Sequence, residues 1–163
     1  MSADSFDLAV RLGHSLQDRR WIVATAESCT GGLIAGAITD VAGSSGWFDR
    51  GFVTYSNEAK IEMLGVRPET LAAHGAVSEA TAREMAAGAL ERSRADIAVA
   101  VTGVAGPAGG TPDKPVGLVC FAWARRHASA EARTERFGGD RAEVRAATVD
   151  VALQGLIERA LRR

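Results

Sequence analysis

Three side chains in the sequence could together supply a nucleophile, its base and a proton relay. Ser28 lies in the glycine-rich turn ESCTGG, residues 27–32, between a short apolar run and a helical pattern. A serine in such a turn can attack a substrate when a base lies beside it. Lys60, in the segment YSNEAK after a second apolar run, is such a base once burial removes its proton. Tyr55 opens that segment, and its hydroxyl could relay or donate a proton.

Each of these residues also has a purely structural interpretation. Serine is a favoured helix N-cap, so Ser28 could simply begin the helix that follows it. Lys60 could be a solvated helix residue, and Tyr55 a core ring with its hydroxyl at the rim. Cys29 could replace Ser28 as the nucleophile, but none of the three histidines lies in a motif that suits a Cys–His pair. The residue types alone leave these alternatives open.

The basic residues are divided very unequally between arginine and lysine, since 17 of the 19 are arginine and only Lys60 and Lys114 are lysine. Arginine stays protonated inside proteins, whereas lysine can lose its proton, so the two differ in acid–base chemistry. Compositional bias explains the count equally well. Lys114 lies in a second glycine-rich segment, where it could be a turn charge or contact an anion.

Two glycine-rich loops are predicted to line one ligand site. Because ligands of α/β sheets bind beyond the carboxyl ends of the strands, both loops, each of which follows an apolar strand pattern, fall at such a place. The amides of Thr30, Gly31 and Gly32 are candidates for an oxyanion site at the start of a helix. In the second loop, residues 103–117, the candidate binding residues are Thr102 just before it and Gly103, Gly106, Gly109, Gly110 and Lys114. Neither loop matches a P-loop, a dinucleotide fingerprint or the G-x-S-x-G elbow.

The order of the predicted elements favours one α/β domain over residues 1–163. Strands are predicted over 21–26, 51–55, 97–102, 118–124 and 130–137, and helices over 4–20, 33–39, 57–64, 68–73, from Ser78 and from Asp140. Alternating strands and helices indicate three layers, α/β/α, around a largely parallel sheet. The charged alternation AEARTERF at 130–137 is typical of an edge strand, here predicted to be antiparallel.

Composition narrows the classes of function. The net charge of −1 argues against a nucleic-acid binder with a large basic face. The sequence has no apolar run of the length needed to cross a bilayer and no signal peptide, so we expect a cytoplasmic protein without membrane contact. Two cysteines are too few for a disulfide scaffold, and no ligand cluster predicts a metal site.

Taken together, the motifs resemble one family. TAESCTGG, AGSSGWFDRGFVTYSNEAK, GAVS, TGVAGPAGG, KPVG and GDR occur in this order over nearly the whole chain. This pattern is similar to the C-terminal domain of CinA, the competence/damage-inducible protein, whose stand-alone versions are nicotinamide-nucleotide amidohydrolases. Since Met1 directly precedes the first predicted helix, we expect the stand-alone form.

The resemblance implies hydrolysis of nicotinamide mononucleotide to nicotinate mononucleotide and ammonia, without metal or cofactor. It makes Ser28 the nucleophile, Lys60 its base and Tyr55 a helper of proton transfer to the leaving ammonia. It also implies that the second loop lines the nucleotide pocket. Arg141, in the GDR motif, could meet the phosphate or stay on the surface near Arg145.

We expect a small-molecule substrate, no nucleic-acid partner, and a homo-oligomer such as a dimer. Two other functions remain open. One is a non-catalytic nucleotide-binding or interaction module linked to DNA uptake or damage, which the family name suggests. The other is a phosphate-cradling transferase that needs Mg²⁺ and a nucleoside triphosphate. The missing P-loop and the lack of an acidic pair beside the glycine loops argue against the transferase.

Overall fold

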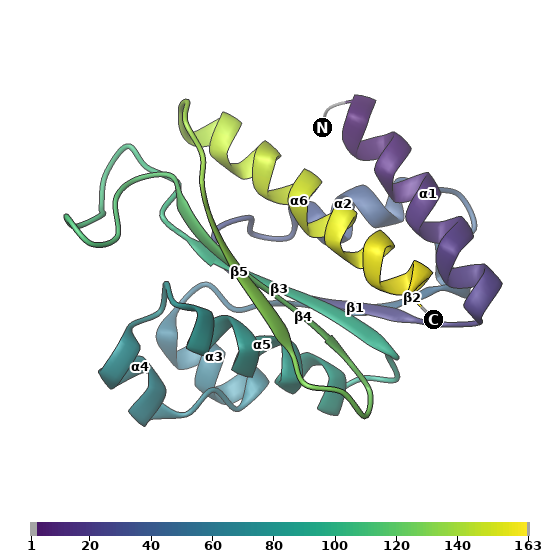
Figure 1. Cartoon of the computed structure of the whole chain (residues 1–163), viewed down its shortest axis with the longest axis horizontal. Helices are drawn as coiled ribbons and strands as arrows, with labels where there is room; N and C mark the ends of the chain where they lie inside the picture. Colours follow the sequence, from purple (N-terminus) through teal and green to yellow (C-terminus); the bar gives the residue numbers. More distant parts are fainter. Residues whose placement is uncertain (1–2, 163) are drawn as a thin grey trace.

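The predicted apolar strands form one five-stranded sheet in the computed structural model, which describes residues 3–162 (Figure 1). The strand order is β2-β1-β3-β4-β5. Their bounds are β1 Val23–Glu27, β2 Phe48–Val53, β3 Ile97–Gly103, β4 Leu118–Arg125 and β5 Glu131–Arg136. β1 pairs in parallel with both β2 and β3, whereas β4 is antiparallel to β3 and β5. The carboxyl ends of β1, β2 and β3 therefore lie together at one edge of the sheet.

Helices cover both faces of this sheet (Figure 1). One face carries α1 (Ala3–Arg19), α2 (Leu33–Thr39) and α6 (Arg141–Leu161), and the other carries α3 (Asn57–Leu64), α4 (Pro68–His74) and α5 (Glu79–Glu91). A short 3₁₀ helix spans Ser44–Gly46. None of the helices within residues 3–162 is long and apolar enough to span a bilayer.

The side chains of β3 alternate between two hydrophobic cores, which differ in the size of their residues. Ile97, Val99 and Val101 face the α1–α6 side, and the alanines between them face α5. The α5 side is built largely from alanine, so helix and sheet approach closely. At Gly88 an added Cβ would lie 1.9 Å from the Leu64 carbonyl oxygen, which shows how tightly α3 and α5 pack. This packing fixes α3, the helix that carries Lys60.

The predicted fold class is confirmed, including the antiparallel edge strand. The antiparallel part of the sheet extends one strand further than the sequence indicated, because β4 also runs antiparallel to its neighbour β3. β2 begins at Phe48, three residues before the predicted start at Gly51. Asp49 and Arg50 interrupt the apolar pattern there, yet the backbone of this segment pairs with β1 from Val23 onward.

Capping residues stand at the ends of three of the predicted helices. Ser56 Oγ accepts the Ala59 amide at the start of α3, and Ser78 caps α5 in the same way. α3 ends at Gly65, whose φ of 71° lies in the left-handed region. Asp140 begins α6 with a reciprocal capping box. These caps set where α3, α5 and α6 start relative to the carboxyl edge of the sheet.

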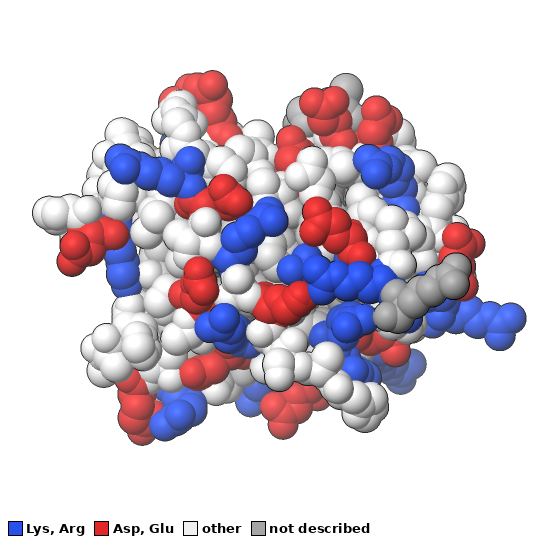
Figure 2. All heavy atoms as spheres, in the orientation of Figure 1, with Lys and Arg blue, Asp and Glu red and all other residues white. Residues whose placement is uncertain are grey.

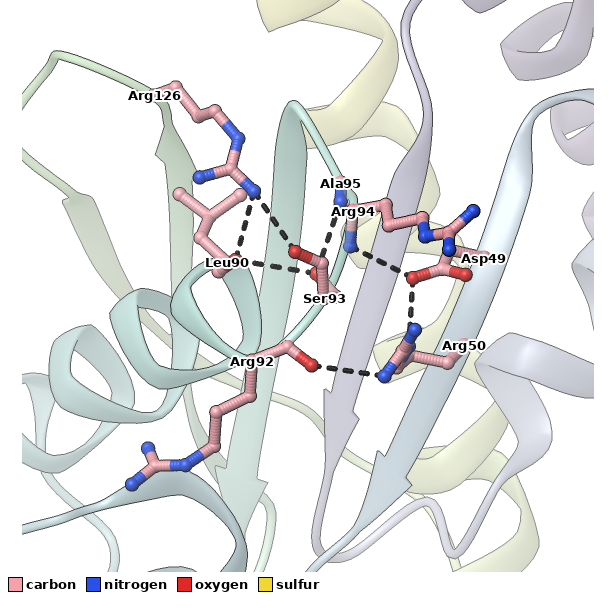
Figure 3. A network of polar contacts seen from close by, with 8 residues as sticks. All are labelled: Asp49, Arg50, Leu90, Arg92, Ser93, Arg94, Ala95 and Arg126. Atoms are coloured by element: carbon pink, nitrogen blue, oxygen red, sulfur yellow. Dashed lines mark hydrogen bonds and ion pairs between the residues drawn. The ribbon is translucent and has the colours of Figure 1, made fainter.

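Arginine side chains connect the elements at the amino end of β3, opposite the carboxyl edge that the caps face (Figure 3). Arg50 donates to the Arg92 carbonyl (3.2 Å) and Arg126 to the carbonyls of Leu90 and Ser93 (both 3.1 Å), so guanidinium groups bind the exposed end of α5. The Arg94 amide and the Arg50 side chain both donate to Asp49, and these bonds keep the pKa of that carboxyl below its ordinary value. Figure 2 shows positive and negative side chains interspersed over the face it presents.

Candidate active site

A cavity of about 190 Å³ opens at the carboxyl edge of the three parallel strands. Glu27, the last residue of β1, lies beside Val53 of β2 and Val101 of β3, so the segments that follow these strands converge. The lining residues come from these segments and from the starts of α3, α5 and α6: Ser28, Cys29, Tyr55, Lys60, Ala76, Val77, Thr102, Gly103, Ala105 and Arg141. The structure thus brings together all three residues of the predicted hydrolytic centre.

Lys60 is held against Ser28 by its position on α3. It is the fourth residue of that helix, and helical side chains lean toward the N-terminus, so its amine reaches back to the end of β2. Its Nζ lies 3.0 Å from Ser28 Oγ, 2.8 Å from the Thr54 carbonyl oxygen and 3.2 Å from the Tyr55 carbonyl oxygen. A neutral amine has two N–H groups and one lone pair, which match two carbonyls and one hydroxyl donor.

Burial favours this neutral form. Lys60 is 1% exposed, and burial lowers the pKa of its amine, with the nearby Cys29 thiol opposing the shift. Within residues 3–162, none of the ion pairs includes Lys60. Ser28 is 8% exposed and faces the same cavity. The pair therefore has the geometry of a nucleophile beside its base.

The nucleophile turn, residues 28–32, is anchored by the buried carboxylate of Glu27. Its Oε1 accepts the Thr30 hydroxyl (2.5 Å) and the Ile34 amide (2.9 Å), and its Oε2 accepts the Ala35 amide (3.0 Å). The Glu27 carbonyl also accepts the Thr54 amide at 2.8 Å. Since the Thr54 carbonyl binds Lys60, Glu27 connects the turn that carries Ser28 to the segment that holds Lys60.

Cys29 lies beside Ser28 in the same cavity but has the wrong acidity for a nucleophile. Burial raises the pKa of its thiol to about 11, and the nearby Glu27 carboxylate adds to the effect. The reactive species of cysteine is the thiolate, which this environment disfavours near neutral pH. Of the two neighbouring candidates, the structure therefore supports Ser28.

The structure changes the prediction that the amides of Thr30, Gly31 and Gly32 form an oxyanion site, because one of them is already bonded. The Gly31 amide donates to the Ser28 carbonyl at 3.1 Å and is not available to a substrate. Glu27 occupies the amides of the first turn of α2, so this helix does not present a free positive end to a ligand. Thr30, Gly31 and Gly32 are also not among the residues that line the cavity. The oxyanion role of the Thr30 and Gly32 amides stays a prediction.

Only the start of the second loop, residues 103–117, lines the cavity. Gly103 and the preceding Thr102 line it, whereas Gly109 and Gly110 are exposed and do not. Gly106 acts through its carbonyl, which accepts Arg141 at 2.8 Å. Lys114 also lies outside the cavity, because its amine donates to the His74 carbonyl.

Tyr55 and Arg141 line the cavity in different ways. Tyr55 is 64% exposed, and its contribution to Lys60 comes from the backbone carbonyl. Arg141 stands at the first position of α6 and joins the second loop through Gly106. Arg145, one turn along α6, is not merely a surface residue: it donates to the carbonyls of Cys29 (3.1 Å) and Thr30 (3.3 Å).

Sequence reasoning missed four other contributors to the site. Glu27 belongs to the ESCTGG motif, and an acidic residue at the end of an apolar strand that leads into a helix is a signal that could have been used, because the first helical amides need acceptors. The Thr54 carbonyl left no such signal, because backbone contacts do not depend on residue type. Ala76 and Val77 are part of GAVS, a motif that the sequence analysis quoted without assigning it a role.

The fold and the site together define an α/β protein with a buried serine–lysine pair in a cavity. The family described as the CinA C-terminal domain matches residues 5–160. The chain belongs to this family.

Similar proteins cover nearly the whole chain. The nicotinamide-nucleotide amidohydrolase PncC of Escherichia coli strain K12 is 55% identical over 154 residues, which span 94% of this chain and 93% of that protein. The crystal structure of the competence/damage inducible protein CihA from Agrobacterium tumefaciens superposes with a TM-score of 0.95 at 54% identity, covering 97% of this chain and 96% of that one. The competence damage-inducible protein A from Klebsiella pneumoniae gives 0.92 at 45% identity, covering 95% and 96%.

Proposed function

We propose that this protein is an amidohydrolase that converts nicotinamide mononucleotide and water to nicotinate mononucleotide and ammonia. The observation that carries the proposal is the contact of Lys60 Nζ with Ser28 Oγ, 3.0 Å, inside a cavity at the carboxyl edge of the sheet. The name of the similar Escherichia coli protein supports the choice of substrate.

The reaction begins when Ser28 Oγ attacks the carboxamide carbon and its proton passes to the lone pair of Lys60. The carbon–nitrogen bond then breaks, and the amide nitrogen takes that proton and leaves as ammonia. Water attacks the resulting ester, giving a proton to Lys60, which returns it to the serine oxygen as nicotinate mononucleotide is released. The carbonyls of Thr54 and Tyr55 keep the amine oriented through both steps.

The hydroxyl of Tyr55 is proposed to assist proton transfer to the leaving nitrogen. Tyr55 lines the cavity, and its side chain is exposed enough to turn toward a bound substrate. Tyr55→Phe removes that hydroxyl and keeps the backbone carbonyl that binds Lys60. We expect kcat to fall about tenfold with little change in KM, measured by ammonia release.

The nucleotide portion of the substrate is assigned to an adjoining hollow of about 580 Å³. Ala105 and Arg141 line both spaces, so a ligand can extend from Ser28 past the guanidinium. Arg141 then lies where it can pair with the phosphate. Arg141→Met should raise KM for nicotinamide mononucleotide about tenfold or more and leave KM for the phosphate-free riboside nearly unchanged. Equal increases for both would contradict this assignment.

The central test is ammonia release from nicotinamide mononucleotide by the wild type and by Ser28→Ala. A non-catalytic module would bind nucleotide without releasing ammonia, and Ser28→Ala would behave like the wild type.

We also propose that the enzyme works in the cytoplasm. A charged nucleotide crosses membranes poorly, so the enzyme must be in the same compartment as its substrate. The predicted homo-oligomer stays a prediction, which light scattering of the purified protein measures directly.

A further inference from the structure

One wall of the Ser28 cavity is the segment His74–Ser78, which joins α4 to α5. Ala76 and Val77 in this wall segment line the cavity directly. Three successive carbonyls of the segment, those of His74, Gly75 and Ala76, each accept a hydrogen bond from at least one side chain outside it. The donors are Lys114 Nζ to His74, Ser78 Oγ (3.1 Å) and Thr81 Oγ1 (2.7 Å) to Gly75, and Thr102 Oγ1 (2.9 Å) to Ala76.

These donors differ in where they come from. Thr102 stands on β3, and Ser78 and Thr81 belong to the start of α5, so they fix the wall to regular elements of the fold. Lys114 alone among them comes from the second loop. It therefore joins two parts of the site that are 40 residues apart in sequence, the wall segment and the loop that continues from Gly103.

The local backbone is shaped to receive this amine. Gly75 has a φ of 78°, in the left-handed region that favours glycine, and a Cβ added there would lie 2.9 Å from Lys114 Nζ. The amine thus packs directly against the glycine backbone. It also lies at the last residue of α4, where a cation meets the carbonyl end of the helix dipole. A charged donor on a carbonyl at such a place is stronger than a neutral one.

We infer that Lys114 is a positioning residue that clamps the second loop to the wall segment and so sets the shape of the cavity at Ala76 and Val77. It acts on substrate binding and not on proton transfer, because its amine lies outside the cavity while Lys60 occupies the base position. The inference rests on the proposed function for its substrate, but the clamp itself is a property of the structure.

The test compares Lys114→Met with the wild type. Methionine keeps the length and apolar stem of the side chain and removes the charged donor. We expect KM for nicotinamide mononucleotide to rise about tenfold and kcat to stay within about twofold, which is the signature of lost binding. In parallel, the amide ¹⁵N order parameters of Ala76 and Val77 should fall from about 0.85 toward about 0.6, because the wall loses one anchor.

Arg83→Met is the matched control. Arg83 is an exposed cation on α5 whose ion pair is with Glu79 at 3.8 Å, one turn away on the same helix. This substitution should leave KM, kcat and the order parameters of the wall segment unchanged. Melting temperatures within about 4 °C of the wild type show that all variants are folded.

Three outcomes decide the inference. Unchanged order parameters together with unchanged KM in Lys114→Met overturn it. A fall in kcat that matches the fall in kcat/KM also overturns it, because the lysine then acts on chemistry. If the wild type releases no ammonia from the nucleotide but the order parameters still fall in Lys114→Met, the proposed substrate is wrong and the clamp is supported.

Discussion

The two glycine-rich loops look alike in sequence but differ in how the fold holds them. The nucleophile turn after β1 is largely buried and bound from several sides, by the Glu27 carboxylate, by Arg145 and by the backbone of β3. The second loop after β3 is exposed around Gly109 and Gly110; Arg141 and Lys114 attach it by side-chain bonds, and backbone bonds hold its ends, at Val104 and Gly117. In the proposed mechanism the first positions the attacking oxygen, whereas the second shapes the space around it.

This difference shows what identifies a catalytic loop. Glycine content is shared by both segments and separates neither from an ordinary turn. Buried polar partners do separate them, because a polar group removed from water must be satisfied and so becomes fixed in place. Ser28 and Lys60 are such groups, and the exposed glycines of the second loop are not.

Substitutions in the nucleophile pair should have the largest effect. Ser28→Ala removes the attacking oxygen, and Lys60→Arg replaces the base with a group that stays protonated. Each should lower kcat about 10³-fold or more in an ammonia-release assay. Ser15→Ala, at a partly exposed serine of α1 whose hydroxyl donates to the Arg11 carbonyl, is the control and should be silent. Full activity in Lys60→Arg would disprove the serine–lysine mechanism.

A smaller loss is expected from Glu27→Gln, which keeps the shape of the side chain. The amide supplies one acceptor oxygen where the carboxylate has two, so one of the α2 amides or the Thr30 hydroxyl meets an N–H group. We expect kcat to fall about 10-fold to 100-fold and KM to change little. The reason is that Ser28 shifts relative to the Thr54 and Tyr55 carbonyls that hold Lys60. A rise in KM alone would show that Glu27 does not position the pair.

The pH dependence should distinguish Ser28 from its neighbour Cys29. Modification of Ser28 by a small phosphonylating reagent should accelerate about tenfold per pH unit up to the pKa of Lys60, which burial places below the ordinary 10.5. Alkylation of Cys29 should stay slow until the pH approaches about 11. Mass spectrometry of the modified peptide measures both rates. A thiol that reacts readily at neutral pH would contradict the assignment of Ser28.

The smallest effect on activity is expected in the second loop. Gly31 (φ 57°) and Gly109 (φ 85°) are both left-handed, so alanine at either should cost roughly 1–2 kcal/mol of stability. An added Cβ at Gly31 would lie 3.5 Å from the guanidinium of Arg145, which holds the nucleophile turn, whereas at Gly109 it meets only Val104 at 3.7 Å. Denaturant unfolding should give similar losses for both, with kcat reduced only in Gly31→Ala. Equal losses of kcat would remove the distinction between the loops.

The sequence predicted the fold class, the antiparallel edge and most helix starts, because periodicity and capping residues are local signals. It also predicted the serine–lysine pair, since Ser28 and Lys60 follow strands whose ends meet. It did not predict that Glu27 would accept the first amides of α2 and the Thr30 hydroxyl of the turn. Nor did it predict that Lys114 would contact His74, because that bond depends on how a long loop folds back. Long-range polar contacts of this kind require the assembled structure.

The burial of Lys60 against the Thr54 and Tyr55 carbonyls also couples the protonation of its amine to folding. In the unfolded chain the amine titrates at its ordinary value, near 10.5, while burial lowers its pKa in the folded protein. Between those two values the unfolded state holds a proton that the folded state does not, so stability rises with pH through this window and is lost as pH falls. Folding in that window discharges a proton into the solvent. The free energy of folding therefore keeps the Lys60 amine neutral in this window, before substrate binds. Refolding in weak buffer within the same pH window should acidify the medium.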